Sequence, residues 1–215
     1  MEAPALPFQP SLLGAAATEP AASFASARRT DLGRGAWVDH VPGFLDGADT
    51  LFTALLHGTS WRQRDVPMYG RMVTEPRLSA WWGAEDGVPA ERLARAPAAL
   101  RDLLPVLDAR YERGFDAIGL NLYRTGRDSV AWHGDRHERR RPVTTVAVLS
   151  LGSPRRFLLR PVGGGASRAV EMFSGDLLVM GGTCQHTWQH CIPKVARAGP
   201  RMSATFRRRL HPTER

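Results

Sequence analysis

The sequence predicts a mainly β protein with α/β elements on its N-terminal side. From about residue 115 onward, short apolar runs alternate with turns rich in glycine and proline, which is typical of strands. Earlier in the chain, two stretches carry apolar residues at the spacing of amphipathic helices. Many short strands preceded by a few helices favour a β-sandwich or a barrel with the helices packed on its outside.

The first residues of the chain are expected to be disordered. Residues 1–34 are rich in alanine, proline and serine and show no period, which predicts a flexible leader. Residues 35–215 have the length of one domain, and we expect order to begin near Trp37. A helix is then predicted between an N-cap at Asp46 and an end at Gly58. The apolar face of this helix consists of Leu51, Phe52 and Leu55.

The segment between this helix and the main run of strands is expected to be mixed. Residues 61–74 are predicted to be extended chain with turns at a proline and a glycine. A leucine-rich helical pattern then runs from Pro89 to Arg113. Pro97 and Pro105 lie inside that pattern, and we expect two shorter helices because proline removes a helical hydrogen bond.

Strands dominate the second half of the sequence. The run 143–151 is rich in β-branched residues and long enough for a buried strand. Residues 168–173 and 176–180 are predicted to pair as a hairpin around Ser174 and Gly175. The predicted strands are 115–123, 143–151, 156–161, 168–173, 176–180, 190–193 and 202–208.

Composition restricts the class of partner and the compartment. A net charge of +8 favours a polyanionic partner such as nucleic acid, although a compositional bias toward arginine would explain it equally, because Lys194 is the single lysine. Two cysteines are too few for a disulfide framework and indicate a reducing compartment, so a cytoplasmic location is expected. No apolar run approaches the ~20 residues of a membrane span, and no signal peptide is predicted.

The most informative motif is His133-Gly134-Asp135, which is followed 55 residues later by His190. Residues i and i+2 of an extended chain point to the same side, so the histidine and the aspartate can reach one metal ion. Two histidines and one carboxylate are the ligand set of a mononuclear iron(II) site that keeps positions open for a co-substrate and oxygen. His186 and His137 are the alternatives for the third ligand. His190 is preferred because it begins a β-type segment.

Two arginines, Arg201 and Arg207, follow the last histidine. They are six residues apart, and an even separation places both on one face of an extended strand. A guanidinium group binds a carboxylate bidentately, so either arginine can hold an anionic co-substrate such as 2-oxoglutarate. A solvated basic edge strand is the alternative, and the neighbouring Arg208 and Arg209 favour it.

The order, spacing and flanking residues of these motifs match a known pattern over about residues 60–209. The matching segments are Asn121-Leu122-Tyr123-Arg124, Trp132-His133-Gly134-Asp135, Val148-Leu149-Ser150-Leu151-Gly152, Gly175-Asp176-Leu177-Leu178, Trp188-Gln189-His190, Pro200-Arg201 and Thr205-Phe206-Arg207. Taken together they resemble the AlkB-type Fe(II)/2-oxoglutarate-dependent dioxygenases. The resemblance is greatest to the branch that repairs alkylated bases in nucleic acid.

The resemblance implies a double-stranded β-helix, or jelly-roll, over residues 115–210, preceded by an N-terminal extension and nucleotide-recognition lid over residues 35–114. It implies that iron(II) is bound by His133, Asp135 and His190. It further implies that 2-oxoglutarate is held by Asn121, Tyr123, Arg201 and Arg207.

The activity that the resemblance implies is oxidative dealkylation of alkylated bases in DNA, with RNA as a further candidate. The expected products besides the repaired base are formaldehyde, succinate and CO2, and the enzyme is expected to act as a monomer without a membrane partner. A 2-oxoglutarate-dependent oxygenase that acts on a protein or a small molecule is the alternative.

The lid and the loop after the metal motif are expected to bind the substrate. A base must leave its stack to reach the iron, and Met68 or Tyr69 would fill the gap that it leaves. Trp82 would stack on the base together with His133, whereas a core position is an equal alternative for Trp81. Family members often carry acidic residues directly after the His-x-Asp motif. Here Arg136 and His137 come first, which leaves the lesion open. The expected substrate-binding residues are Met68, Tyr69, Arg71, Arg77, Trp82, His137 and Glu138.

Overall fold

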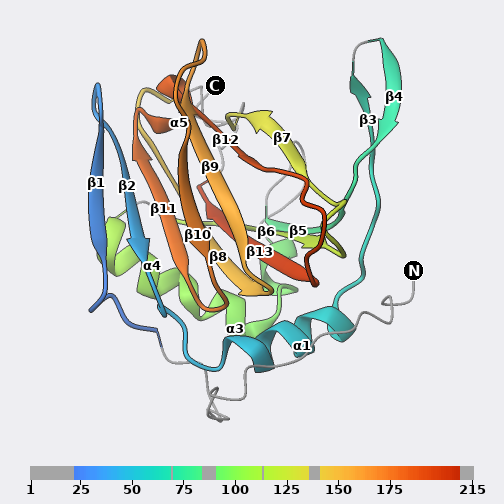
Figure 1. Cartoon of the computed structure of the whole chain (residues 1–215). Coiled ribbons are helices and arrows are strands. Elements are labelled where there is room, and N and C mark those ends of the chain that lie inside the picture. Colours follow the sequence, from blue (N-terminus) through green and yellow to red (C-terminus); the bar gives the residue numbers. More distant parts are fainter. Residues whose placement is uncertain (1–21, 69, 84–90, 113, 136–140, 209–215) are drawn as a thin grey trace.

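The computed structural model describes residues 22–68, 70–83, 91–112, 114–135 and 141–208, which form a β-sandwich with helices along one side (Figure 1). The elements in chain order are β1 (Arg28–Gly33), β2 (Ala36–Val41), α1 (Ala48–Gly58), β3 (Asp65–Met68), β4 (Arg71–Thr74), β5 (Leu78–Gly83), α2 (Glu91–Ala94), α3 (Ala98–Arg101), α4 (Leu103–Tyr111), β6 (Ala117–Tyr123), β7 (Val130–His133), β8 (Thr144–Gly152), β9 (Arg155–Pro161), β10 (Arg168–Met172), β11 (Leu177–Gly182), α5 (Cys184–Thr187), β12 (Trp188–Ile192) and β13 (Arg201–Arg207). None of the described helices is both long and apolar enough to cross a membrane.

Two antiparallel sheets make up the sandwich. The larger sheet has seven strands in the order β1-β2-β11-β8-β13-β6-β5, and the smaller sheet has four in the order β10-β9-β12-β7. Strands that follow one another in sequence often lie in different sheets, as in a jelly-roll, so the prediction of a mainly β jelly-roll core is confirmed. Among the described strands, β3 and β4 pair only with each other, and they project away from the sandwich (Figure 1).

Strand β8 lies at the centre of the molecule, and all nine of its residues are buried. Leu149 and Leu151 belong to the core between the larger sheet and the helices, where Phe52 of α1 also packs. Val146 and Val148 belong to the core between the two sheets, together with Phe157 of β9. A strand that is covered on both faces needs an almost continuous apolar sequence, which explains the β-branched run in this segment.

Strand β13 instead alternates between the two sides of the larger sheet. Met202, Ala204 and Phe206 join the core beneath the helices. Arg201 and Arg207 occur at the intervening positions, and neighbouring side chains of a strand point to opposite faces. The strand lies between β8 and β6, and Arg201 is 0% exposed, so the alternative of a solvated basic edge strand is wrong.

The ordered part of the chain begins earlier than predicted. The sequence predicts a flexible leader over residues 1–34. Residues 28–33 form strand β1, which pairs with β2. Its sequence is polar, but Arg29 donates two hydrogen bonds, of 2.7 and 2.8 Å, to the buried carboxylate of Asp39 and lies 3.9 Å from the ring of Trp37. These cross-strand contacts stabilise an edge strand that has no apolar pattern of its own. Residues 1–21 lie outside the described residues.

The predicted start of the first helix is wrong by one position. Gly47, not Asp46, precedes α1 as its N-cap, with a φ of 69° and no side-chain capping bond. The buried face is as predicted, because Leu51, Phe52 and Leu55 are all buried. The leucine-rich segment forms three short helices rather than two. Pro97 precedes α3 and Pro105 lies in the first turn of α4, where the missing N–H breaks no helical bond.

The hairpin predicted around Ser174 and Gly175 is also wrong. Strand β10 pairs with β9 in the smaller sheet, whereas β11 pairs with β2 and β8 in the larger one. The chain therefore crosses between the sheets at this turn. Gly175 has a φ of 87°, and a Cβ at this position would lie 2.6 Å from the carbonyl oxygen of Leu45, so the crossing requires glycine.

Candidate metal centre and active site

The two histidines of the predicted triad face each other across a pair of strands. His133 ends β7, and His190 lies in β12 directly opposite it in the antiparallel register. Their ring centroids are 4.2 Å apart. Asp135 follows β7 by two residues, and the ligand atoms of the three side chains all lie within 4.8 Å of one another. Such a cluster can hold one metal ion, as expected from the sequence.

The hydrogen bonds around the histidines suit metal binding. Nδ1 of His133 lies 2.8 Å from the carbonyl oxygen of Ala131, so this nitrogen carries the proton and Nε2 remains free to bind a metal. The ring of His190 stacks on Phe157 at a centroid distance of 5.2 Å. Burial, and then the nearby His133, lower the pKa of His190 to about 3. The imidazole is therefore neutral at physiological pH, as a metal ligand must be.

Asp135 is held at its main chain and at its carboxylate. Its N–H donates to Oε1 of Gln185 at 3.0 Å, and its Oδ1 lies 3.3 Å from Nη1 of Arg207. Burial alone would raise the pKa of the carboxyl group, but Arg207 and then the two histidines outweigh it, and the net pKa is lowered. Asp135 thus offers a negative charge where a cation would sit.

Arg201 is the least solvated cation of the site. It is 0% exposed, and its Nε donates to Oγ of Ser150 at 3.1 Å. Within the described chain its Nη1 and Nη2 have no hydrogen-bond partner. Burial lowers its pKa to about 10, so the group keeps its charge at neutral pH. A buried charge with two free donors is costly unless an anion binds it, and a carboxylate fits the two donors bidentately.

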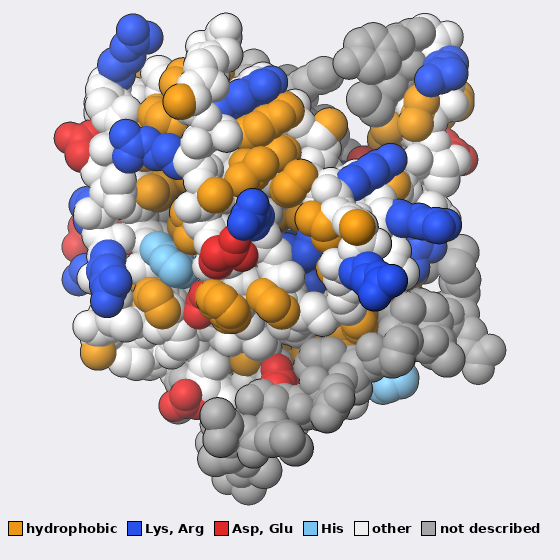
Figure 2. Space-filling model, viewed as in Figure 1, with side chains coloured by type: hydrophobic (Ala, Val, Ile, Leu, Met, Phe, Trp, Pro, Cys, Tyr) orange, Lys and Arg blue, Asp and Glu red, His pale blue; other side chains and the backbone are white. Residues whose placement is uncertain are grey.

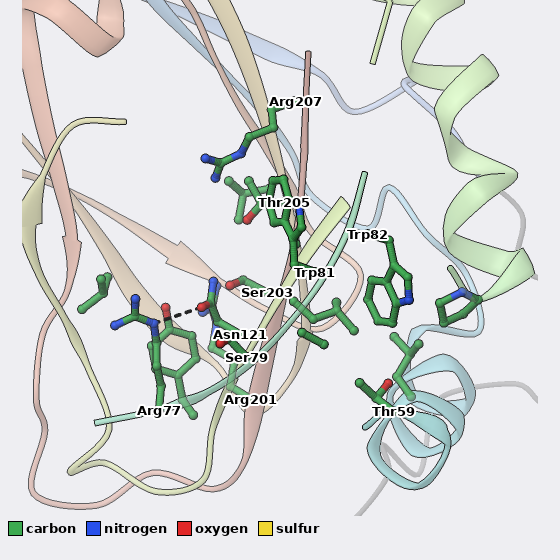
Figure 3. Close-up of a pocket in the computed structure, with 18 of the residues that line it drawn as sticks. Thr59, Arg77, Ser79, Trp81, Trp82, Asn121, Arg201, Ser203, Thr205 and Arg207 are labelled. Carbon is green, nitrogen blue, oxygen red and sulfur yellow. Dashed lines mark hydrogen bonds between the residues drawn. The ribbon is translucent and has the colours of Figure 1, made fainter. Parts of the chain in front are cut away.

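One cavity of about 1230 Å³ joins the metal cluster to this guanidinium group. The inner face of the larger sheet forms its wall, where Asn121 of β6 lies beside β13 (Figure 3). Tyr123 of β6 lines the same wall. The guanidinium carbon of Arg201 lies 5.3 Å from the centroid of the Tyr123 ring. Asn121 accepts a hydrogen bond of 2.9 Å from Nε of Arg77. The structure thus brings together the four residues expected to hold 2-oxoglutarate.

The two tryptophans of β5 lie on opposite faces of the larger sheet. Trp82 pairs with Ile118, packs against the core on the helical side and also lines the cavity there (Figure 3). Trp81 pairs with Gly119 and lies on the inner face beside Arg207, 5.5 Å from its guanidinium carbon. A Cβ on Gly119 would lie 2.8 Å from the Trp81 ring, so the missing side chain makes room for the indole. Both indoles line the cavity, Trp81 from the inner face and Trp82 from the helical side. The assignment of the base to Trp82 therefore stays a prediction, and Trp81 is a second candidate.

The remaining substrate candidates are unevenly placed. Arg77 lines the cavity and is paired with Glu75 at 2.8 Å. Arg71 is exposed on β4, in the projecting hairpin, and outside the cavity. Met68 ends β3, but its side chain lies outside the described residues. Tyr69, His137 and Glu138 also lie outside the described residues.

The alternative ligand His186 has another role. It lies in the single turn α5, and its Nε2 is 2.6 Å from the carbonyl oxygen of Arg141. Within the described part of the chain it does not join the cluster formed by His133, Asp135 and His190. The alternative ligand His137 lies outside the described residues.

Sequence reasoning missed two buried residues next to the site, Gln185 and Arg155. Gln185 holds the main chain of Asp135. The guanidinium of Arg155 donates to the carbonyl oxygens of Asp128, at 3.1 Å, and of Pro193, and thereby ties together the loops before β7 and after β12. Neither residue belongs to a motif. The one available signal was that Arg155 shares the strand face of Phe157 and Leu159 by alternation.

Comparison with known proteins identifies this arrangement. The family model described as "2OG-Fe(II) oxygenase superfamily" matches residues 47–215. The chain belongs to this superfamily. Its relatives are of the AlkB type: "DNA oxidative demethylase ALKBH2" of Arabidopsis thaliana is 30% identical, and the match covers 89% of this chain and 73% of that protein. "Alpha-ketoglutarate-dependent dioxygenase alkB homolog 3" of Homo sapiens is 33% identical over 77% of this chain.

The chain spans 64% of the length of the human and bovine alkB homolog 3 proteins. Among solved structures, that of OsALKBH1 has a TM-score of 0.52 at 17% identity and covers 84% of this chain and 100% of its own. A 2OG-Fe(II) oxygenase-family oxidoreductase from Burkholderia pseudomallei has a TM-score of 0.52 at 13% identity, covering 79% of this chain and 84% of its own. These two structures share the fold with this chain.

Membership of the superfamily implies iron(II) and 2-oxoglutarate, and the residues present fit both. His133, Asp135 and His190 provide one neutral imidazole of low pKa, a second with a free Nε2, and a charged carboxylate. The unpartnered donors of Arg201 provide a place for the distal carboxylate of the keto acid.

Proposed function

We propose that the protein removes alkyl groups oxidatively from bases of DNA, with RNA as a further substrate, and releases formaldehyde, succinate and CO2. The observation that carries the proposal is the cavity that the His133, Asp135 and His190 cluster shares with the buried guanidinium of Arg201, whose Nη1 and Nη2 have no partner within the described residues. Iron(II), 2-oxoglutarate and oxygen supply the oxidant that hydroxylates an N-alkyl carbon, after which the adduct releases an aldehyde.

The residues of the chain have separate tasks in this reaction. His133, Asp135 and His190 hold the metal, and Arg201 holds the distal carboxylate of the co-substrate. Arg207 keeps Asp135 charged and lines the same cavity, where it would help to orient the co-substrate. Asn121 and Tyr123 line the same wall and limit the freedom of the keto acid. Fixing these groups before reaction is the main contribution of the protein to the rate.

The charge of the cavity supports a nucleic-acid substrate. Beyond the metal cluster, its lining extends around strand β5 and includes Arg62, Arg64, Arg92 and Arg95. Glu75 is the acidic side chain in that outer part within the described residues, and it is paired with Arg77. Lys and Arg side chains also gather below the β3–β4 hairpin (Figure 2). Arginines bind phosphate groups, so these walls suit a polyanionic chain entering the site.

Trp81 supports a planar substrate group. Its indole lies on the inner face of β5, lines the same cavity as the metal ligands, and is backed by Gly119 and Arg207. Aromatic faces stack on extruded bases, and each stacked base contributes about 1–3 kcal/mol to binding. We assign to Trp81 the stacking role that the sequence suggested for Trp82.

We further propose a monomer that works in a reducing compartment such as the cytoplasm. Cys184 and Cys191 are both buried and free. Burial raises the pKa of the Cys184 thiol to about 12 and that of the Cys191 thiol to about 11. Thiols of this kind are unreactive and are typical of proteins that are not stabilised by disulfides.

The test is one assay with a matched inactive variant. The purified protein is incubated with iron(II), ascorbate, 2-oxoglutarate and a panel of methylated DNA and RNA oligonucleotides, and product masses and succinate are measured. We expect loss of the methyl group from at least one base type, coupled to succinate, and no turnover with Asp135→Ala. Succinate formation without any change in an oligonucleotide would overturn the assignment of substrate. Succinate formation by Asp135→Ala at the rate of the parent protein would overturn the assignment of the metal centre.

A further inference from the structure

We propose that Gln185 is a positioning residue for the metal centre. Its side-chain carbonyl would hold the main chain at Asp135 so that the carboxylate stays directed at the point shared with His133 and His190. The inference rests on the metal site of the proposed function and adds to it a residue that provides no ligand atom itself.

Gln185 and Asp135 are in direct contact although they lie in distant segments of the sequence. The N–H of Asp135 donates to Oε1 of Gln185 at 3.0 Å, across 50 residues of sequence. Gln185 is 1% exposed. In the low-dielectric interior a hydrogen bond is stronger than in water, and breaking it leaves a polar group without solvent to replace the partner.

Hydrogen bonding fixes the orientation of the side-chain amide of Gln185. The main-chain N–H of Asp135 is a donor, so it must meet the oxygen of the amide rather than its NH2 group. Nε2 of Gln185 then lies 3.7 Å from the sulfur of Met180, a weak acceptor on β11. A side chain of the same length without an oxygen would fill the space but would leave the Asp135 N–H without this acceptor.

The position of Gln185 connects two ligand-bearing segments. It lies in the single turn α5, which runs directly into β12, and β12 carries His190. The next residue, His186, lies 2.6 Å from the carbonyl oxygen of Arg141. Neighbouring side chains of α5 therefore bind the chain at Asp135 and again at Arg141. This turn couples the placement of the carboxylate ligand to the strand that holds the second histidine.

The carboxylate needs this support more than the histidines do. His133 and His190 are paired in register across β7 and β12, so the sheet itself fixes their relative position. Asp135 lies beyond the end of β7 and outside that ladder. Among the described residues, Arg207 contacts its carboxylate and Gln185 accepts a hydrogen bond from its main chain. Outer-shell partners of metal ligands typically contribute about 10–100-fold to metal affinity.

The test compares Gln185→Met, Gln185→Glu and the parent protein by anaerobic iron(II) titration. We expect Gln185→Met to lose about 10–100-fold in iron(II) affinity. Gln185→Glu keeps an oxygen at the same place and should regain most of the loss. Gln189→Met is the matched control, because Gln189 is next to His190 but its Oε1 accepts from Arg160 at 3.2 Å instead of contacting the ligand loop. This control should bind iron(II) as the parent does.

A second measurement uses the metal-free parent protein alone, so it does not depend on whether a substituted protein folds. In the metal-free parent protein, hydrogen exchange of the Asp135 amide should be slow, because the N–H is bonded to a buried side chain. Rapid exchange at this amide would overturn the inference. So would equal iron(II) affinity of Gln185→Met and the parent protein. If the parent protein itself bound no iron(II), the proposed function would be wrong. This result differs from those that overturn only the role of Gln185.

Discussion

The guanidinium of Arg207 lies against the carboxylate of Asp135, with 3.3 Å between Nη1 and Oδ1. The two side chains are 16% and 11% exposed, so solvent screens their attraction less than it would at the surface. Arg207 also lies 5.5 Å from the ring centroid of Trp81. Its Nε has no hydrogen-bond partner within the described residues. One arginine therefore keeps a metal ligand charged and still has a donor available for a bound anion.

Replacing Arg207 by methionine should make iron(II) binding depend on pH. Burial would still raise the pKa of Asp135, but the largest opposing charge would be gone, so the pKa of this carboxyl group should rise. We expect iron(II) affinity to fall about tenfold or more at neutral pH, and to fall further as the pH is lowered. Anaerobic titrations at two pH values measure this effect. Arg197→Met, an exposed arginine in the loop before β13, is the control, and a pH profile shared by both variants would refute the role of Arg207.

Replacing Arg201 by methionine should separate co-substrate binding from metal binding. The variant loses the two unpaired donors that we assign to the distal carboxylate of 2-oxoglutarate. A charge-assisted hydrogen bond contributes about 1.5–3 kcal/mol, so the KM for 2-oxoglutarate should rise roughly 10–100-fold. Iron(II) affinity should change little. An unchanged KM would show that the keto acid is held elsewhere.

The same substitution should not destabilise the metal-free protein, although Arg201 is fully buried. A buried charge without an ionic partner costs free energy, and an apolar side chain of similar length removes that cost. We expect the free energy of unfolding of Arg201→Met to equal or exceed that of the parent protein. Urea unfolding in the absence of 2-oxoglutarate measures it. A loss of about 3 kcal/mol or more, as seen when one partner of a buried ion pair is removed, would mean that Arg201 has an ionic partner without the co-substrate.

His190 should make the metal-free protein less stable in mild acid. Its pKa is about 3 in the folded chain, below the ordinary value of 6.5, so the unfolded chain binds a proton that the folded chain does not. The stabilisation is complete above pH 6.5 and is lost as the pH falls toward 3. Between pH 7 and pH 5 the loss should be about 2 kcal/mol. Urea unfolding at both pH values should show a smaller loss in His190→Gln, and an equal loss would contradict this origin.

The sequence could predict which site residues share one face of a strand, because that information is local. His133 and Asp135 are two residues apart on extended chain, and Arg201 and Arg207 are separated by an even number of residues on one strand, so each pair shares a face whatever the sheet order. The apolar run of β8 likewise marks a strand buried on both faces. These inferences depend on the backbone geometry of single strands.

The errors arose where the outcome depends on pairing between distant segments. The face of Trp81 follows from the register of β5 on β6, where Gly119 leaves room for the indole. The contact between Asp135 and Gln185 joins residues 50 positions apart. The alternation of β10 and β11 indicated two strands and a turn, but it carries no information on which sheet each strand enters. The alternation of apolar and polar side chains identifies a strand, but the strand with which it pairs is decided by the packing of the whole fold.

The adjacent tryptophans of β5 allow a direct test of substrate binding. Both side chains line the cavity, but Trp81 lies on the inner face of the larger sheet with the metal ligands, whereas Trp82 packs on the helical side. We expect Trp81→Ala to raise the KM for a methylated oligonucleotide about 10-fold or more, because one stacked base contributes about 1–3 kcal/mol. Iron(II) affinity and the KM for 2-oxoglutarate should stay close to those of the parent protein.

Trp82→Ala should show the opposite pattern. This side chain is only partly buried, so its loss should lower the free energy of unfolding by roughly 1–3 kcal/mol, less than for a fully buried aromatic residue. The KM for the oligonucleotide should be unchanged at a temperature where the variant is folded. Kinetics and urea unfolding of both variants together decide the assignment. If Trp82→Ala raised the oligonucleotide KM and Trp81→Ala did not, the base would approach from the helical side of β5, and the inner face would not be the substrate wall.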